Sequence, residues 1–231
     1  MNRFYLSFLL VLGISSGLQA QLELMNKPFM DDVRFNKIIE GTYLRNNLKF
    51  SDIQGSPYLS DKFENGKIIT QEDSVFSNIE LRYNAYSDDL EFKQGENIYN
   101  VAFKLLVKKA EFGNNTFGYR NYELEGAKHD GFLKILAQGK ATLLVKYTIR
   151  FSDREEAKAF SDFQPARFEE PIEQYFLSIN DASATLFTTK KMLIILLSDH
   201  KGEIESYLSK NKISLKDERG LVELISFYNS L

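Results

Sequence analysis

One stretch of the chain alternates apolar and polar residues with a period of two. In residues 141–151 every odd position is apolar, whereas the even positions include threonine, lysine and arginine. Because successive side chains of a β-strand point to opposite faces, this pattern predicts a half-buried strand with one face in water. Residues 79–85 repeat the pattern, with Glu80, Arg82 and Asn84 pointing outward. The chain from about residue 42 to residue 189 is therefore expected to consist of strands.

Short polar segments separate these apolar runs and have the composition of hairpin turns. Asn-Gly dipeptides tolerate the positive φ angles of a two-residue hairpin, and short loops force neighbouring strands to pair antiparallel. Residues 21–41 are less regular and predict an irregular lead-in, and residues 152–172, with two prolines, predict a loop that crosses a sheet edge. The six predicted turns are Asn65-Gly66, Ser87-Asp88-Asp89, Gln94–Asn97, Gly113-Asn114-Asn115, Gln138-Gly139-Lys140 and Asn180-Asp181.

The period changes after Thr188 and Thr189, either of which can cap a helix. Residues 192–197 are six consecutive apolar residues, which suit a buried strand or a buried helix, and we favour the helix because helical spacing follows. Ser214 and Asp217 resemble a capping box. Beyond them a stripe with helical spacing predicts a face turned to the core, formed by Leu221, Leu224, Ile225 and Tyr228.

These patterns together predict an α+β protein that is mainly β. The β domain, residues 42–189, is expected to form an antiparallel meander as a curved sheet, a partial barrel or a sandwich. Residues 190–231 are expected to form two or three helices packed on that sheet.

The first twenty residues have the order of a secretory signal peptide. Arg3 gives a basic start, residues 4–12 are apolar apart from one serine, and small residues follow. We expect cleavage between Ala20 and Gln21, in preference to nearby sites such as Gly17; a membrane anchor or a buried helix is the alternative. The mature chain would then have no transmembrane span and would be exported to the periplasm, the cell envelope or the medium.

The composition excludes several classes of function. The chain has no cysteine, so it has no disulfide framework, no cysteine-based zinc site and no thiol nucleophile. Its formal charge of −3 gives no basic surface for nucleic acid. Because an exported chain without disulfides must be held together by its core, we expect most of the 19 Phe and 12 Tyr side chains to be buried.

The sequence singles out no catalytic, cofactor-binding or metal-binding residue. His129 lies in a segment with turn composition and His200 at a helix junction, and neither accompanies a nucleophile or metal motif. The adjacent acids Asp31-Asp32 and Asp88-Asp89 lack the spacing of a calcium loop and are expected to face solvent. Two short motifs suggest glycosylation, Asn114-Asn115-Thr116 and Asp73-Ser74-Val75.

Four segments resemble a set of exported Bacteroidetes proteins of unknown function. They are Gly55-Ser56-Pro57-Tyr58-Leu59, Leu81-Arg82-Tyr83-Asn84, Leu90-Glu91-Phe92-Lys93 and the final Phe227-Tyr228-Asn229-Ser230-Leu231. The resemblance implies an antiparallel β domain with C-terminal helices and an envelope location. It implies no reaction and assigns no functional residue.

Three functions agree with these patterns. We expect a non-catalytic envelope protein that binds an apolar ligand or an envelope partner, since curved aromatic-rich sheets have concave faces. One alternative is a secreted hydrolase that uses paired carboxylates. The other is a structural or adhesive surface subunit with an unpaired edge strand.

Overall fold

The computed structural model describes residues 35–38, 53–157 and 162–231 of the 231-residue chain. The predicted signal peptide, its cleavage site at Ala20 and Gln21, and Asp31-Asp32 lie outside these residues. Thirteen strands are described, eleven of them in one sheet. The strands are β1 Phe35–Ile38, β2 Glu64–Thr70, β3 Val75–Asn84, β4 Asp89–Gln94, β5 Asn97–Val101, β6 Val107–Phe112, β7 Asn115–Leu124, β8 Ala127–Ala137, β9 Ala141–Thr148, β10 Phe151–Ser152, β11 Arg167–Phe168, β12 Ile172–Ile179 and β13 Ala184–Leu186.

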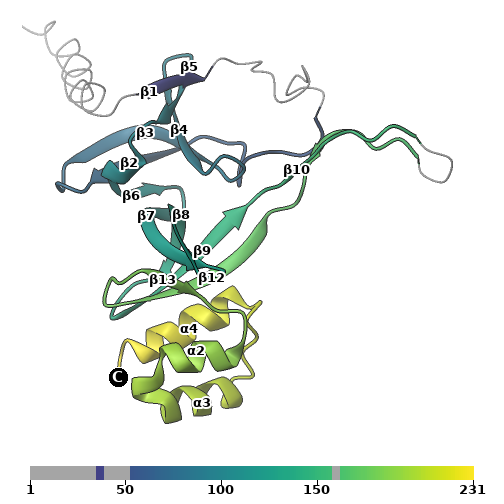
Figure 1. Ribbon diagram of the computed structural model, residues 1–231. Coiled ribbons are helices and arrows are strands. Elements are labelled where there is room, and N and C mark those ends of the chain that lie inside the picture. Colours follow the sequence, from purple (N-terminus) through teal and green to yellow (C-terminus); the bar gives the residue numbers. More distant parts are fainter. Residues whose placement is uncertain (1–34, 39–52, 158–161) are drawn as a thin grey trace, which may run out of the picture.

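The predicted fold class is confirmed, and the sheet has two parts. Strands β1 to β6 form a curved N-terminal sheet in the order β1-β5-β4-β3-β2-β6. Strands β7, β8, β9, β12 and β13 each pair with two others in a closed circuit, which makes a small barrel. The N-terminal sheet continues into the barrel through the β6–β7 pair. In Figure 1 this sheet lies above the barrel and the helices lie below it.

The expectation of purely antiparallel pairing is wrong at one seam of the barrel. Strand β13 pairs parallel with β7, Ala184 opposite Tyr122 and Thr185 opposite Glu123. A closed ring of five strands cannot alternate direction at every step, so closure requires at least one parallel pair. The seam is short, which limits the number of the slightly weaker parallel bonds.

Five of the six predicted turns are confirmed, and the exception is Asn65-Gly66. Strand β2 runs through this dipeptide, with a bulge between Gly66 and Lys67. A Cβ on Gly66 would lie 2.6 Å from the Cβ of Phe112 on β6, so the glycine is explained by close strand contact rather than by a turn. The hairpin that sequence reasoning missed is Glu125-Gly126 between β7 and β8, where both residues have positive φ.

The loop predicted over residues 152–172 contains a two-stranded arm instead. Strands β10 and β11 pair antiparallel, and Glu155 and Gln164 form a further bridge along the arm. The rings of Phe151 and Phe168 meet edge to face at the base, 5.5 Å apart. In Figure 1 the arm projects away from the barrel.

The helical C-terminal segment is confirmed from Lys190 onward. It contains α2 Lys190–Leu196, the 3₁₀ turn η4 Ser198–His200, α3 Lys201–Lys210 and α4 Glu218–Tyr228; a further 3₁₀ turn, η3 Lys104–Leu106, precedes β6. The hydroxyl of Thr189 caps α2 by accepting the Met192 amide. Asp217, not Ser214, caps α4, because its carboxylate accepts the Gly220 amide. The predicted stripe of α4 is buried and packs on β8 and β9.

Two apolar cores result from this arrangement. The larger one fills the space between the N-terminal sheet, the outside of the barrel and the helices. The smaller one fills the barrel itself, through Tyr122, Leu133, Leu144, Phe176 and Ala184. Among the described Phe and Tyr side chains only Tyr86, Phe103 and Phe163 are exposed, so most described aromatics stabilise the fold. No helix within the described ranges is long and apolar enough to cross a membrane.

Candidate functional site

The inward face of β9 defines two ends of the barrel. Leu144 belongs to the buried barrel core, and residues two positions away on a strand share its face. Thr142 therefore faces inward toward one end and Lys146 toward the other, opposite Ser178 and Gln174 of β12. We call the Lys146 side the closed end and the Thr142 side the open end.

The closed end is occupied by a buried ion pair. The Lys146 ammonium lies 2.6 Å from the Asp88 carboxylate and donates to the Phe132 carbonyl at 3.2 Å. Asp88 also accepts the Tyr83 hydroxyl at 2.8 Å and the Phe132 amide at 3.3 Å. Burial lowers the pKa of Lys146 even though the nearby Asp88 acts to raise it. The end is thus filled by groups that satisfy one another.

Gly131 makes this contact possible. A Cβ at Gly131 would lie 2.4 Å from the Asp88 carboxylate and 3.0 Å from the Lys146 ammonium. Asp88 comes from the turn between β3 and β4 and so joins the N-terminal sheet to the barrel. Its neighbour Asp89 forms an ion pair with Lys104 at 2.5 Å. The expectation that Asp88-Asp89 faces solvent is therefore wrong, because both acids bind lysines brought to them by the fold.

The open end holds a cavity of about 210 Å³ with a polar lining. Arg120 of β7 is half-buried there, and the hydroxyl-bearing residues Thr142 and Ser178 are buried beneath it, 4% and 6% exposed. The full lining is Gln71, Tyr119, Arg120, Asn121, Thr142, Leu144, Ser178, Asp181, Ala182, Ser183 and Ala184.

Arg120 differs from Lys146 because it has no partner among the residues that the structure describes. Within the described part of the chain its guanidinium makes no ion pair, hydrogen bond or ring contact. Gly118, two residues earlier on the same face, leaves room for it: a Cβ there would lie 3.1 Å from Arg120 Nε. The chain therefore presents a positively charged planar fork in a cavity lined by hydroxyl and amide groups.

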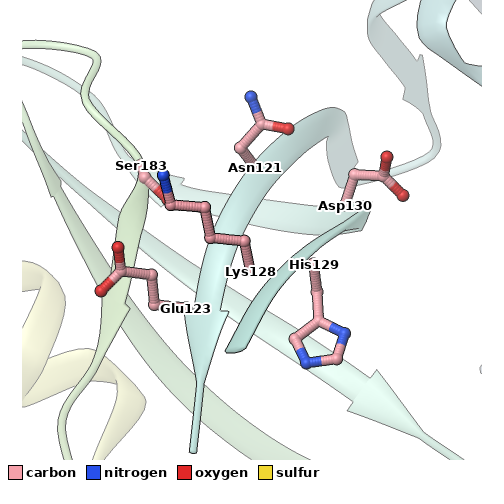
Figure 2. A pocket seen from close by; sticks show the side chains of 6 residues that line it. All are labelled: Asn121, Glu123, Lys128, His129, Asp130 and Ser183. Atoms are coloured by element: carbon pink, nitrogen blue, oxygen red, sulfur yellow. The ribbon is translucent and has the colours of Figure 1, made fainter. Parts of the chain in front are cut away.

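A second, larger depression adjoins the open end and shares Asn121 and Ser183 with it (Figure 2). It has a volume of about 540 Å³, and Glu123, Lys128, His129 and Asp130 complete its lining. All six residues are exposed, so this is open surface. Its two carboxylates, Glu123 and Asp130, are the candidates for a paired-carboxylate hydrolase, but a general acid needs an apolar environment that this surface lacks.

His129 lies in β8, which corrects its predicted place in a turn. The turn falls earlier, at Glu125-Gly126, so that the strand begins at Ala127. His129 stacks on Tyr122, with ring centroids 5.4 Å apart, while the next residue, Asp130, accepts the Tyr119 hydroxyl at 2.9 Å. Neighbouring strand residues face opposite ways, and Figure 2 shows His129 pointing away from Asp130 and Ser183. A Ser–His–Asp relay is not assembled here.

His200 lies at the predicted helix junction, in the helical segment. It ends the 3₁₀ turn η4, and its ring meets Tyr228 of α4 edge to face at 5.7 Å. The two histidines are therefore not brought together. Across the described residues, no three His, Asp or Glu side chains are grouped closely enough to hold a metal ion.

A third cavity lies between the N-terminal sheet and the barrel, and we call it the junction cavity. Its volume is about 240 Å³. Aromatic side chains from four strands form much of its wall: Tyr83 of β3, Phe112 of β6, Phe117 of β7 and Tyr147 of β9. The remaining lining residues are Leu59, Ser60, Lys62, Glu64, Arg82, Asn115 and Lys134.

The three cations of the junction cavity differ in their partners. Arg82 Nε donates to the Glu91 carboxylate at 3.1 Å, and its guanidinium lies 3.5 Å from the centroid of the Tyr58 ring. Burial and the Glu91 charge raise the pKa of Tyr58 to about 12, so its ring remains neutral beside them. Lys62 and Lys134, by contrast, form no ion pair with any described residue.

Sequence reasoning missed Arg120 and Lys134 as site residues. Arg120 shares a strand face with Tyr122, so the available signal was a charged residue on a face that also carries a core residue. This signal could be interpreted only with the knowledge that this face of β7 lines the barrel. Lys134 is one of many lysines on alternating strands and carries no such signal.

Comparison with known proteins adds no assignment. No protein-family model matches the chain, no curated protein matches it, and no solved structure matches the fold.

Proposed function

We propose that the protein is an exported envelope protein that binds, without catalysis, a small amphipathic ligand with an apolar body and an anionic group. The ligand occupies the junction cavity. The observation that carries the proposal is the combination, in one cavity, of an aromatic wall with two lysines that have no acidic partner among the described residues.

The aromatic wall suits an apolar body. Phe117 is fully buried, and Tyr83, Phe112 and Tyr147 are 2–6% exposed, so their positions are fixed by packing before any ligand binds. A preformed wall lowers the entropy lost on binding. The volume of about 240 Å³ lies below the range of roughly 300–1,000 Å³ of drug-sized sites, which favours a small ligand.

The two lysines suit an anionic group. Lys134 is half-buried and Lys62 is exposed, so one ammonium lies at the wall and the other nearer to solvent. A charge-assisted hydrogen bond to a carboxylate contributes about 1.5–3 kcal/mol. Glu64 also lines the cavity, which favours a single anionic group on the ligand over several.

Export is supported by the signal-peptide pattern and by the resemblance to exported Bacteroidetes proteins. Both glycosylation motifs agree with it, since Asn114 and Ser74 lie in exposed turns. The barrel is filled by its own side chains, which argues against the barrel interior as the ligand site.

The test is a calorimetric titration of the purified protein with octanoate. We expect saturable binding that Lys134→Met weakens by about tenfold, the equivalent of about 1.4 kcal/mol. Lys210→Met removes an exposed lysine of α3 and serves as the matched control, with no expected change. Absence of octanoate binding, or equal binding by the Lys134 variant, contradicts the proposal. Mass spectrometry of protein isolated from its native source then identifies the bound ligand.

A further inference from the structure

The geometry points to a second binding site, at the open end of the barrel, for a small polar ligand that carries a carboxylate or phosphate group. Arg120 recognises the oxyanion, and the hydroxyl groups of Thr142, Ser178 and Ser183 with the Asn121 amide bind the rest. This site shares no lining residue with the junction cavity, so it stands independently of the proposed function.

The Arg120 guanidinium is isolated from the acids of the described residues. Half-burying a cation without an acidic partner costs free energy, and two other cations of the fold avoid that cost: Arg82 is paired with Glu91, and the buried Lys146 is paired with Asp88. Arg120 stands apart from both. A guanidinium presents a planar fork of donors that matches carboxylate and phosphate oxygens, which makes an oxyanion the fitting partner.

The polar groups around Arg120 keep hydrogen-bonding capacity for a ligand. Ser178 donates its hydroxyl proton to the Ala182 carbonyl at 2.6 Å, which leaves its oxygen as an acceptor toward the cavity. Thr142 lies 3.5 Å from the Gly139 carbonyl, a long hydrogen bond, so its hydroxyl is able to turn toward a ligand. Asp181 also lines the cavity and accepts hydrogen bonds only. The ligand therefore needs donors, such as hydroxyl groups, beside its oxyanion.

The volume of the open-end cavity limits the ligand to a small molecule. The cavity, at about 210 Å³, lies below the range of roughly 300–1,000 Å³ of drug-sized sites. Inorganic phosphate or a short hydroxy acid fits this space, and the polar lining does not suit an apolar tail. The side chain of Leu144 forms the apolar boundary with the barrel core, so the cavity ends where the packed interior begins.

The experiment is a two-dimensional NMR titration of the purified protein with inorganic phosphate and with acetate, at ionic strength held constant with sodium chloride. We expect saturable shifts at the amides of Thr142, Ser178 and Ser183. Arg120→Met should weaken binding at least tenfold, and Arg120→Lys, which keeps the charge without the fork, should give an intermediate loss. Arg150→Met, at an exposed position, is the matched control and should bind as the wild type does.

Two further measurements test the role of the hydroxyl groups and the independence of the two sites. Thr142→Val removes one hydroxyl at nearly constant volume and should weaken binding by a smaller factor, and unchanged NMR spectra away from the open end show that each variant is folded. Octanoate binding should be unaffected by Arg120→Met, which separates this site from the junction cavity. The inference is overturned if neither anion binds saturably, if the Arg120 and Arg150 variants lose affinity equally, or if the shifts lie elsewhere.

Discussion

The two ends of the small barrel each contain one inward-facing cation, and the two cations differ in their partners. At the closed end Lys146 has Asp88 at 2.6 Å and a backbone carbonyl within hydrogen-bond reach. At the open end Arg120 has no charged or hydrogen-bonded partner among the described residues, although Asp181 lines the same cavity. The same barrel therefore contains one cation with an acidic partner and one half-buried cation, Arg120, without a partner among the described residues.

The difference separates a structural role from a binding role. Asp88 belongs to the N-terminal sheet and Lys146 to the barrel, so their ion pair holds two parts of the fold in one arrangement. Arg120 binds no other side chain of the described ranges, and its half-burial costs stability. Charges retained at such a cost are typical of functional sites. Four experiments test this distinction, beginning with the largest expected effect.

Lys146→Met should lower the free energy of unfolding by about 3 kcal/mol, because it leaves Asp88 without its cation in a largely enclosed site. Urea denaturation measures the change. Lys108→Met is the control, since the Lys108–Asp73 pair is exposed and should contribute less than about 1 kcal/mol. Equal losses in the two variants would mean that the closed end is not a structural clamp.

Gly131→Ala should lower the free energy of unfolding by about 2 kcal/mol, because the new methyl group would separate Asp88 from Lys146. Gly126→Ala provides a contrasting glycine with nothing within 4 Å of a Cβ, so that its loss reflects its positive φ alone. Combined with Lys146→Met, the Gly131 substitution should cost less than in the wild type, since the contact is already lost. Additive losses would contradict the clamp.

Arg120→Met should raise the free energy of unfolding by about 1 kcal/mol, because an unpaired half-buried charge is replaced by an apolar chain of similar length. Thermal and urea denaturation in low-phosphate buffer measure the gain. In saturating phosphate the free energy of unfolding of the wild type should rise to that of the variant, since a ligand that binds only the folded state stabilises it. A loss of stability in this variant would place Arg120 with Lys146 as a structural residue.

The smallest effect concerns pH. Burial lowers the pKa of Lys146 below its ordinary value of 10.5 in the folded state. Between the lowered pKa and 10.5 the unfolded chain binds more protons than the folded chain, so this group makes the protein more stable as pH rises. The stability of the wild type relative to Lys146→Met should therefore increase toward pH 10.5, by less than about 1.4 kcal/mol per pH unit. If the difference in free energy of unfolding between the two proteins did not change with pH, a lowered pKa of Lys146 would be excluded.

Local patterns predicted much of the fold. The alternation in residues 141–151 separated the two faces of β9 correctly, but the face with Thr142, Leu144 and Lys146, expected to lie in water, is buried as the interior of the barrel. The odd positions pack in the larger core as expected. The cap at Thr189 and the stripe of α4 were predicted correctly. The reading failed where a contact with another strand decided the outcome. Gly66 is a glycine because Phe112 lies against it, and Asn65-Gly66 therefore continues a strand despite its turn composition.

The candidate sites were less predictable than the fold. Asp88-Asp89 sits in a turn, as predicted, yet its acids face lysines from η3 and β9 rather than water. Lys62, Lys134 and Arg120 are ordinary charged residues of a strand-rich sequence. They become site residues only because the cavities form around them.

The sequence by itself determined which side chains share a face, where the helical segment begins at Lys190, and that no disulfide holds the chain. These properties depend on neighbours within about ten residues, where strand and helix periods fix the direction of each side chain. The tertiary structure alone decided that five strands close into a barrel with one parallel seam, that Lys146 meets Asp88, and that Arg120 meets no acid in the described part of the chain. Such pairings depend on segments distant in the chain, whose approach is set by packing of the whole core and not by any local pattern.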